Sequence, residues 1–182
     1  MTPHIPSIIV PMVASAMVSS IAKYPREYEI TDVTVEEVYC LALNVYFESR
    51  NTSRDDKIAV AYVVLNRFSS GEKKYETLCD VVYEPKQFSW TFDGKLDLPN
   101  LKNVIERKAW EESLQVASDV YFGIVENPVV DAKFYHSVKS VPPEWANKMW
   151  RVRITDGHIF YTMNPSFPLP TPKPPTLVVM KG

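Results

Sequence analysis

The chain has 182 residues, 46% of them hydrophobic and 23% charged, and its 20 Lys+Arg against 22 Asp+Glu leave a formal charge of −2. This composition is typical of globular proteins and excludes a chain that is disordered throughout. A chain of this length buries enough surface to fold without a metal or disulfide scaffold. Binding through phosphates needs a surplus of Lys and Arg, which is missing here, so nucleic acid is not an expected partner.

The cysteines and histidines do not indicate a metal site. Two cysteines and three histidines lack the number and the spacing of a structural zinc site, so we expect no metal ligands. Cys40 and Cys79 either form a disulfide in an oxidising compartment or remain two buried thiols. The sequence leaves both alternatives open.

Residues 1–32 form an N-terminal segment that differs from the rest of the chain in composition. Residues 1–22 contain no Asp, Glu, Lys or Arg, and residues 8–22 are an apolar stretch interrupted by Pro11. The stretch is too short to span a membrane comfortably, and no Lys or Arg precedes it as in a standard signal peptide. It is predicted to be a docking arm, with an uncleaved membrane anchor and a cleaved signal as the alternatives.

Residues 33–163 are predicted to form one domain that begins with two helices. Thr34 and Glu37 have the spacing of a capping box, and apolar residues at three- and four-residue intervals continue the first helix to about residue 48. Ser53 and Asp56 indicate the start of a second helix over residues 55–68. That helix is apolar on nearly every face, so we expect it in the centre of the fold.

The remaining elements define the fold class. A short helix is predicted over residues 77–83, and an aromatic, polar loop over 87–92 is of the kind that lines grooves. An amphipathic helix over 101–122 ends at Gly123. A strand over 133–137 precedes a hairpin that pairs 150–155 with 158–162 across Asp156 and Gly157. The sequence therefore predicts an α+β fold with about four helices and a small antiparallel sheet of two or three strands.

Residues 164–182 are predicted to be a proline-rich tail. Six prolines fall within residues 165–175. They fix φ repeatedly and remove backbone donors, so we expect an extended, polyproline-like segment.

Glu48 lies at the end of the first predicted helix, where the backbone gives way to a groove. Tyr46 and Phe47 beside it offer an apolar wall, which disfavours the charged form of a carboxyl group. A carboxylic acid that keeps its proton near neutral pH can protonate the leaving oxygen of a glycosidic bond. Glu48 is therefore the candidate general acid.

Several motifs in register carry a family resemblance. They are residues 40–50 (CLALNVYFESR), 58–67 (IAVAYVVLNR), 79–83 (CDVVY) and 87–90 (QFSW), followed by 134–136 (FYH), Pro143 with Trp145-Ala146, and Gly157-His158 with Phe160-Tyr161. Together they resemble the SleB/CwlJ-type cell-wall hydrolase family over about residues 34–163.

The resemblance implies a lysozyme-like domain that cuts the β-1,4 bond between N-acetylmuramic acid and N-acetylglucosamine in peptidoglycan. Many members are lytic transglycosylases and others are muramidases, and the reaction needs no cofactor. The resemblance assigns the catalytic acid to Glu48. After this glutamate the family commonly has a small residue, Arg, Gly and Glu, whereas this chain has Ser49, Arg50, Asn51 and Thr52, so the family's second acidic residue is missing.

Hydrolysis by retention or inversion requires a second carboxyl group near the acid. Asp93, Asp97 and Asp131 are the candidates, but each has the sequence setting of a turn or capping residue. A transglycosylase needs one carboxyl group only. We therefore expect the one-carboxylate mechanism, in which the muramoyl 6-hydroxyl closes a 1,6-anhydro ring.

Sugar rings are bound by flat side chains and by amide and hydroxyl groups. The predicted substrate contacts are Gln87, Ser89, Trp90, Tyr135, His136 and Trp145. For Gln87 and His136, a hydrogen bond that supports the fold is an equal alternative. Asn66 and Arg67 are predicted to bind backbone groups or to hold the loop after Glu48. In either role they support the site without contacting the substrate.

The expected partner is therefore the glycan strand of peptidoglycan. The two unusual ends of the chain suggest attachment to phage structural proteins, in the virion or in the host cell envelope, and a free endolysin is the close alternative. A second reading is a catalytically silent wall-binding or structural virion subunit that kept the fold, since glycan binding needs aromatic stacking but no proton donor.

Overall fold

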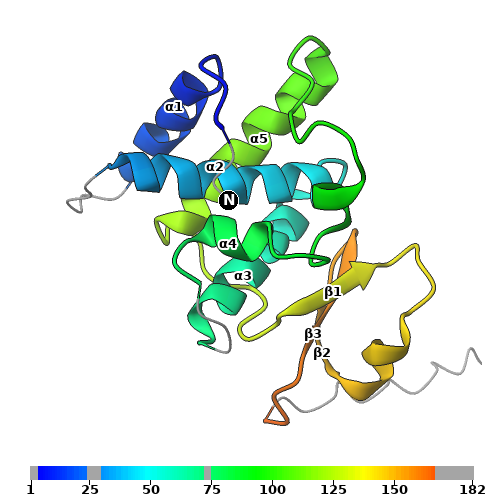
Figure 1. Ribbon diagram of the computed structural model, residues 1–182. Helices are drawn as coiled ribbons and strands as arrows, with labels where there is room; N and C mark the ends of the chain where they lie inside the picture. Colours follow the sequence, from blue (N-terminus) through cyan, green and yellow to red (C-terminus); the bar gives the residue numbers. More distant parts are fainter. Residues whose placement is uncertain (1–3, 24–29, 72–74, 167–182) are drawn as a thin grey trace, which may run out of the picture.

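The computed structural model describes residues 4–23, 30–71 and 75–166. Within these residues the chain forms five α-helices, two short 3₁₀ helices and one three-stranded antiparallel sheet (Figure 1). The α+β fold class is therefore confirmed. The tail predicted from residue 164 lies almost entirely outside the described residues.

The elements follow one another in chain order. They are α1 (Val10–Ile21), α2 (Asp32–Ser49), α3 (Arg54–Ser69), α4 (Leu78–Val82), η1 (Ser89–Phe92), α5 (Val104–Tyr121), β1 (Phe134–Ser137), η2 (Glu144–Lys148), β2 (Trp150–Ile154) and β3 (His158–Thr162). The predicted helices over 55–68 and 101–122 and the predicted strands agree with these bounds to within three residues.

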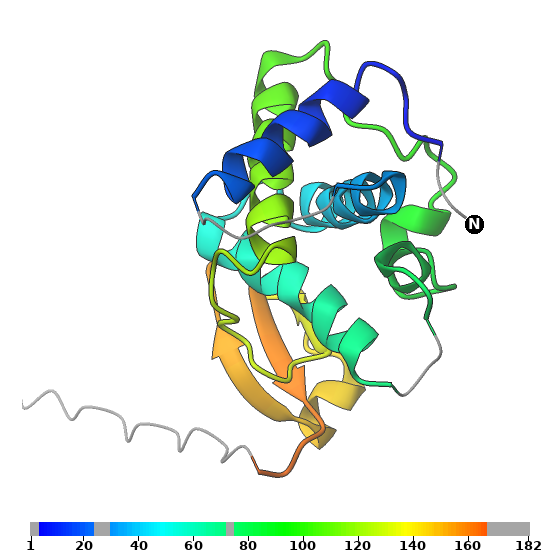
Figure 2. The ribbon, with the colours of Figure 1, turned by 90° about the vertical axis from the view of Figure 1, so that its left-hand side faces the viewer.

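α2 is the central helix. It packs against α1, α3, α4 and α5, and Figure 2, which views it nearly end-on, shows these neighbours around it. Its residues from Val38 to Tyr46 are all buried. Such a helix buries apolar surface on every face, whereas a helix at the surface has one apolar stripe. The helical core therefore surrounds α2, and the sheet lies beside α3, below it in Figure 2.

The start of α2 differs from the sequence prediction. The N-cap is Thr31, and Thr34 is the third helical residue, which closes a capping box with Thr31. Glu37, predicted as the other half of the box, instead accepts hydrogen bonds from the Leu78 backbone and the Tyr121 hydroxyl at 3.0 and 2.6 Å. The prediction was wrong because this glutamate is used for a contact between elements distant in the sequence.

α1 packs across α5 with one apolar face. Ile9, Val13 and Met17 are buried in the core, while Val18 faces outwards. At its C-terminal end, Ser20 donates a hydrogen bond to the buried Asp119 of α5. Among the described helices, none combines the length and the apolar composition required to cross a membrane.

The sheet has the strand order β1-β3-β2, so the hairpin's second strand is central. Tyr135 pairs with Phe160, and a bulge lies between Arg151 and Arg153 of the edge strand β2. The hairpin turn contacts the start of α3, because Asp156 accepts hydrogen bonds from the Ser53 backbone and hydroxyl. The turn therefore joins the sheet to the helical part.

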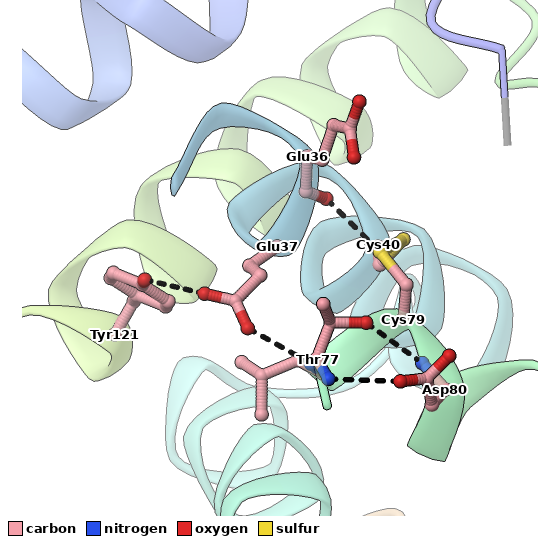
Figure 3. Close-up of a disulfide and its surroundings, with 8 residues drawn as sticks. Glu36, Glu37, Cys40, Thr77, Cys79, Asp80 and Tyr121 are labelled. Atoms are coloured by element: carbon pink, nitrogen blue, oxygen red, sulfur yellow. Dashed lines mark hydrogen bonds between the residues drawn. A yellow bond between two sulfur atoms is a disulfide. The ribbon is translucent and has the colours of Figure 1, made fainter. Parts of the chain in front are cut away.

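Cys40 and Cys79 form a disulfide, which resolves the alternative that the sequence left open. Their Cα atoms lie 5.3 Å apart, and the bond joins the middle of α2 to α4. Figure 3 shows it beside the Glu37 contacts and the Thr77–Asp80 capping box that starts α4. A helix of five residues is too short to be stable alone. The disulfide and these hydrogen bonds therefore hold α4 in place.

Replacing both cysteines by serine is expected to lower the free energy of unfolding by about 4 kcal/mol, because the 39-residue separation sets the entropy of the opened loop. Guanidinium unfolding with and without dithiothreitol measures this effect. The reductant should destabilise the wild type and leave the double serine variant unchanged. Equal stability of wild type and variant would contradict the prediction.

Met17→Ala is expected to lower the free energy of unfolding by about 3 kcal/mol, because Met17 is fully buried and its truncation leaves a cavity. The matched control is Val18→Ala on the outward face of α1, which should change stability by less than about 0.5 kcal/mol. Urea unfolding compares the two variants. Equal losses would show that α1 does not contribute to the core as described.

Candidate active site

A cleft of about 500 Å³ lies between the end of α2 and the sheet. One wall comes from the last turn of α2 and the loop after it, and the other comes from β1 and the β2–β3 turn. The lining residues are Phe47, Glu48, Asn51, Thr52, Ser89, Tyr135, His136, Ser137, Lys139, Asp156, Gly157 and His158. The cleft therefore brings together residues from distant parts of the chain.

Glu48 contributes its carboxyl group to this cleft from the penultimate residue of α2. Burial raises its pKa above the usual value. A hydrogen bond from Tyr135, the nearby His158 ring whenever it is protonated, and the charge of Arg67 act in the opposite direction without cancelling the effect of burial. Glu48 forms no salt bridge with any described residue, so the carboxyl group is free to exchange a proton.

Tyr135 is the direct neighbour of Glu48. Its hydroxyl donates a hydrogen bond to Oε2 of Glu48 at 3.1 Å. Burial and the nearby Glu48 charge hold the pKa of Tyr135 well above its usual range, so the hydroxyl keeps its proton and remains a donor. The bond crosses from β1 to α2 and fixes the orientation of the carboxyl group.

A second hollow of about 550 Å³ adjoins the first one and shares Phe47 and Ser89 with it. Its lining includes Trp90, Asp93 and Asp97. The Trp90 ring stacks on Phe47 with centroids 4.7 Å apart, and its Nε1 donates to Asn44 at 3.3 Å. Trp90 is therefore mainly a support for the wall, with little surface open to a ligand.

The other predicted substrate contacts lie in different places. Ser89 is exposed between the two hollows, and His136 lines the cleft while its ring stacks on Tyr161. Gln87 lines a separate small pocket with Arg67 and Lys133, outside the Glu48 cleft. Trp145 packs edge-on against Tyr161 with centroids 5.5 Å apart and is not among the cleft-lining residues.

Asn66 and Arg67 bind the chain that leads into β1. Asn66 donates from Nδ2 to the Ala132 carbonyl at 2.9 Å, and Arg67 donates from Nε to the Lys133 carbonyl at 2.8 Å. Tyr135 follows two residues after Lys133, so these bonds help to position Tyr135 relative to Glu48.

Sequence reasoning missed the pair formed by Asp56 and His158. Asp56 is fully enclosed, and Nδ1 of His158 lies 2.9 and 3.1 Å from its two carboxylate oxygens. Burial raises the pKa of Asp56, but hydrogen bonds from His158 and Thr155 outweigh it and hold the pKa below its usual value. The sequence placed Asp56 at a helix start and His158 in a family motif after the hairpin turn, and no local signal joins the two.

Asp156, Asp93 and Asp131 have defined partners, whereas Asp97 lines the second hollow. Asp156 lines the cleft but is held by Ser53, and Asp93 accepts hydrogen bonds from the Lys95 backbone and ammonium group. Asp131 accepts a hydrogen bond from Thr162 at 3.3 Å. Within the described residues, no group of three or more His, Cys, Asp and Glu side chains is arranged to hold a metal ion.

Comparison with known proteins identifies the fold's family. No curated protein and no solved structure matches the chain. Residues 51–161, more than half of the chain, match the family described as Cell Wall Hydrolase. The match covers α3, α5, most of the sheet and all of the cleft wall that the sheet provides. The chain therefore belongs to the cell wall hydrolase family of peptidoglycan-degrading enzymes.

Proposed function

We propose that the protein cleaves the β-1,4 bond between N-acetylmuramic acid and N-acetylglucosamine, with Glu48 as the general acid. The observation that carries this proposal is a carboxyl group with a raised pKa in an open cleft, oriented by Tyr135. A group of this kind keeps its proton for transfer to a poor leaving oxygen. The family match begins three residues after Glu48, so the role of Glu48 rests on this geometry and on the sequence motif.

The proposed product is a 1,6-anhydromuramoyl end, as in a lytic transglycosylase. Asp156 is the other carboxylate that lines the cleft, and its two oxygens are occupied by Ser53. A mechanism that uses one carboxyl group fits this arrangement better than one that needs a free second carboxylate. Glu48 protonates the glycosidic oxygen, and the proton of the muramoyl 6-hydroxyl finally returns to Glu48 as the ring closes.

The disulfide supports action outside a reducing compartment, because structural disulfides persist where thiols are oxidised. We therefore propose the cell envelope as the place of action. Use by a phage, in the particle or as an endolysin, stays a prediction from the two ends of the chain. Since α1 packs on α5, its outer face is the part that a phage structural protein would contact.

Glu48→Gln is expected to reduce the release of soluble muropeptides from purified sacculi by at least about 10²-fold, because the glutamine amide is not acidic enough to transfer a proton. The variant should still bind sacculi, since the cleft is unchanged in shape. Mass spectrometry of the wild-type products should show anhydro ends, and reducing ends would indicate a muramidase instead. Equal release by wild type and variant would contradict the assignment of Glu48, and a wild type that binds sacculi but releases nothing would favour the silent wall-binding subunit.

Tyr135→Phe is expected to raise the pKa of Glu48 further, because the lost hydrogen bond stabilises the charged carboxylate. Carbon-13 NMR of labelled glutamate carboxyl groups measures the titration. The matched control is Tyr62→Phe, whose hydroxyl bonds the Val125 carbonyl in another part of the fold. A Glu48 pKa that stays constant or falls in Tyr135→Phe would rule out this contact.

A further inference from the structure

The cleft contains two histidines whose hydrogen bonding differs. His136 has both ring nitrogens occupied, because Nδ1 lies 2.9 Å from the Ser137 carbonyl and Nε2 lies 3.0 Å from the Tyr161 hydroxyl. His158 uses Nδ1 for Asp56, while its Nε2 has no hydrogen-bond partner among the described residues. His158 is therefore the histidine with a nitrogen available to a ligand.

The environment of His158 determines which ring nitrogen is left open to a ligand. Asp56 is fully enclosed and its pKa lies below the usual value, so it accepts a hydrogen bond from Nδ1–H. The nitrogen that remains to accept a proton from a ligand is then Nε2. Nε2 of His158 is not fully enclosed by the described residues, and His158 lines the cleft. This nitrogen can therefore be reached from the cleft.

The backbone around His158 allows little movement of the ring. Thr155 accepts a hydrogen bond from the His158 backbone at 3.0 Å and also donates one to Asp56. A Cβ atom at Gly157 would lie 2.5 Å from Thr52 Cγ2 and 2.6 Å from Asp56 Oδ2, so the turn sits directly on α3. The ring of His158 also meets Tyr135 edge-on with centroids 4.9 Å apart.

From this geometry we infer that His158, oriented by Asp56, is a second catalytic group that receives the proton of the attacking hydroxyl at Nε2. Glu48 reaches the cleft from the helix wall and His158 from the sheet wall, so each approaches the substrate from its own side. The inference rests on the proposed function, because it adds a proton acceptor to the same reaction.

The step balances without another reactant. As the glycosidic bond breaks, the Glu48 proton passes to the leaving oxygen. The oxygen of the muramoyl 6-hydroxyl, or of water in a muramidase, forms the new bond to the anomeric carbon, and its proton moves to Nε2 of His158. The imidazolium then returns this proton to the Glu48 carboxylate, and both groups are ready for another cycle. Asp56 keeps its charge throughout and acts as a positioning residue.

The charged and titratable groups around His158 are known for each neighbouring element. They are Asp56 on α3, Glu48 on α2, Tyr135 and His136 on β1 and Asp156 in the hairpin turn, with Lys139 also lining the cleft and Arg67 acting on Glu48 from α3. In the proposed step, Glu48 and His158 are the groups that exchange protons with the substrate.

The test uses the full chain and measures muropeptide release from sacculi across pH 4 to 9. The wild type should give a bell-shaped profile with two titrating groups. His158→Gln should lose at least about 10²-fold in turnover, keep its binding to sacculi, and show a profile with one titrating group. Imidazole added to His158→Ala should restore activity, and Asp56→Asn should lower turnover because the ring is no longer held in one tautomer.

Ser53→Ala is the matched control. It removes a contact of the same hairpin turn with α3 and the cap on the Asp56 backbone, but it leaves the side-chain hydrogen bonds between Asp56 and His158 in place. It should lower the melting temperature and keep the two-group profile. Nitrogen-15 NMR of the histidine rings should show that Nδ1 of His158 stays protonated while Nε2 titrates.

Three results would overturn the inference. They are turnover of His158→Gln within about threefold of wild type, a two-group profile retained in that folded variant, and titration at Nδ1. If Glu48→Gln is inactive while His158→Gln is fully active, the inference fails and the proposed function stands. If Glu48→Gln is fully active, the proposed function itself fails.

Discussion

α2 is buried through most of its length, and α1, α3, α4 and α5 pack around it. A helix enclosed on all faces has to leave the core at its ends, and α2 leaves it at Phe47 and Glu48, directly at the cleft. The core that stabilises the fold therefore also supplies the low-polarity surroundings that raise the pKa of Glu48. The disulfide and the Glu37 hydrogen bonds act on the other half of the same helix, so they fix the position from which Glu48 projects.

Local sequence signals were sufficient for most of the fold. Apolar periodicity predicted α2, α3 and α5, and Asp156-Gly157 predicted the hairpin turn. The signal failed at Glu37, where the helix start was assigned to a residue that in fact binds Leu78 and Tyr121. A capping pattern states which bonds are available nearby, but it cannot show that a partner 41 or 84 residues away competes for the same carboxylate.

The candidate site was harder to predict than the fold, because it depends on topology. The sequence singled out Glu48 and Tyr135, and the structure brings them into contact, whereas it places Gln87 in another pocket and Trp145 against Tyr161. Asp56 and His158 are 102 positions apart, and only the docking of the hairpin turn on α3 makes them neighbours. An aspartate within a capping pattern and a histidine after a turn have no shared sequence signature.

Glu48 in the cleft and Asp56, enclosed behind it, affect stability with opposite pH dependence. The pKa of Glu48 is raised by folding, so its contribution is present at low pH and is lost as pH rises through the folded-state pKa. The pKa of Asp56 is lowered, so its contribution is present above the unfolded-state pKa and is lost as pH falls through the folded-state value. Above both folded-state pKa values the protein thus retains the stabilisation from Asp56 and bears the cost of a charged, desolvated Glu48. The Asp56–His158 contact joins the sheet wall of the cleft to α3. The contact that offsets the cost of Glu48 therefore also holds the two walls of the cleft in place relative to each other.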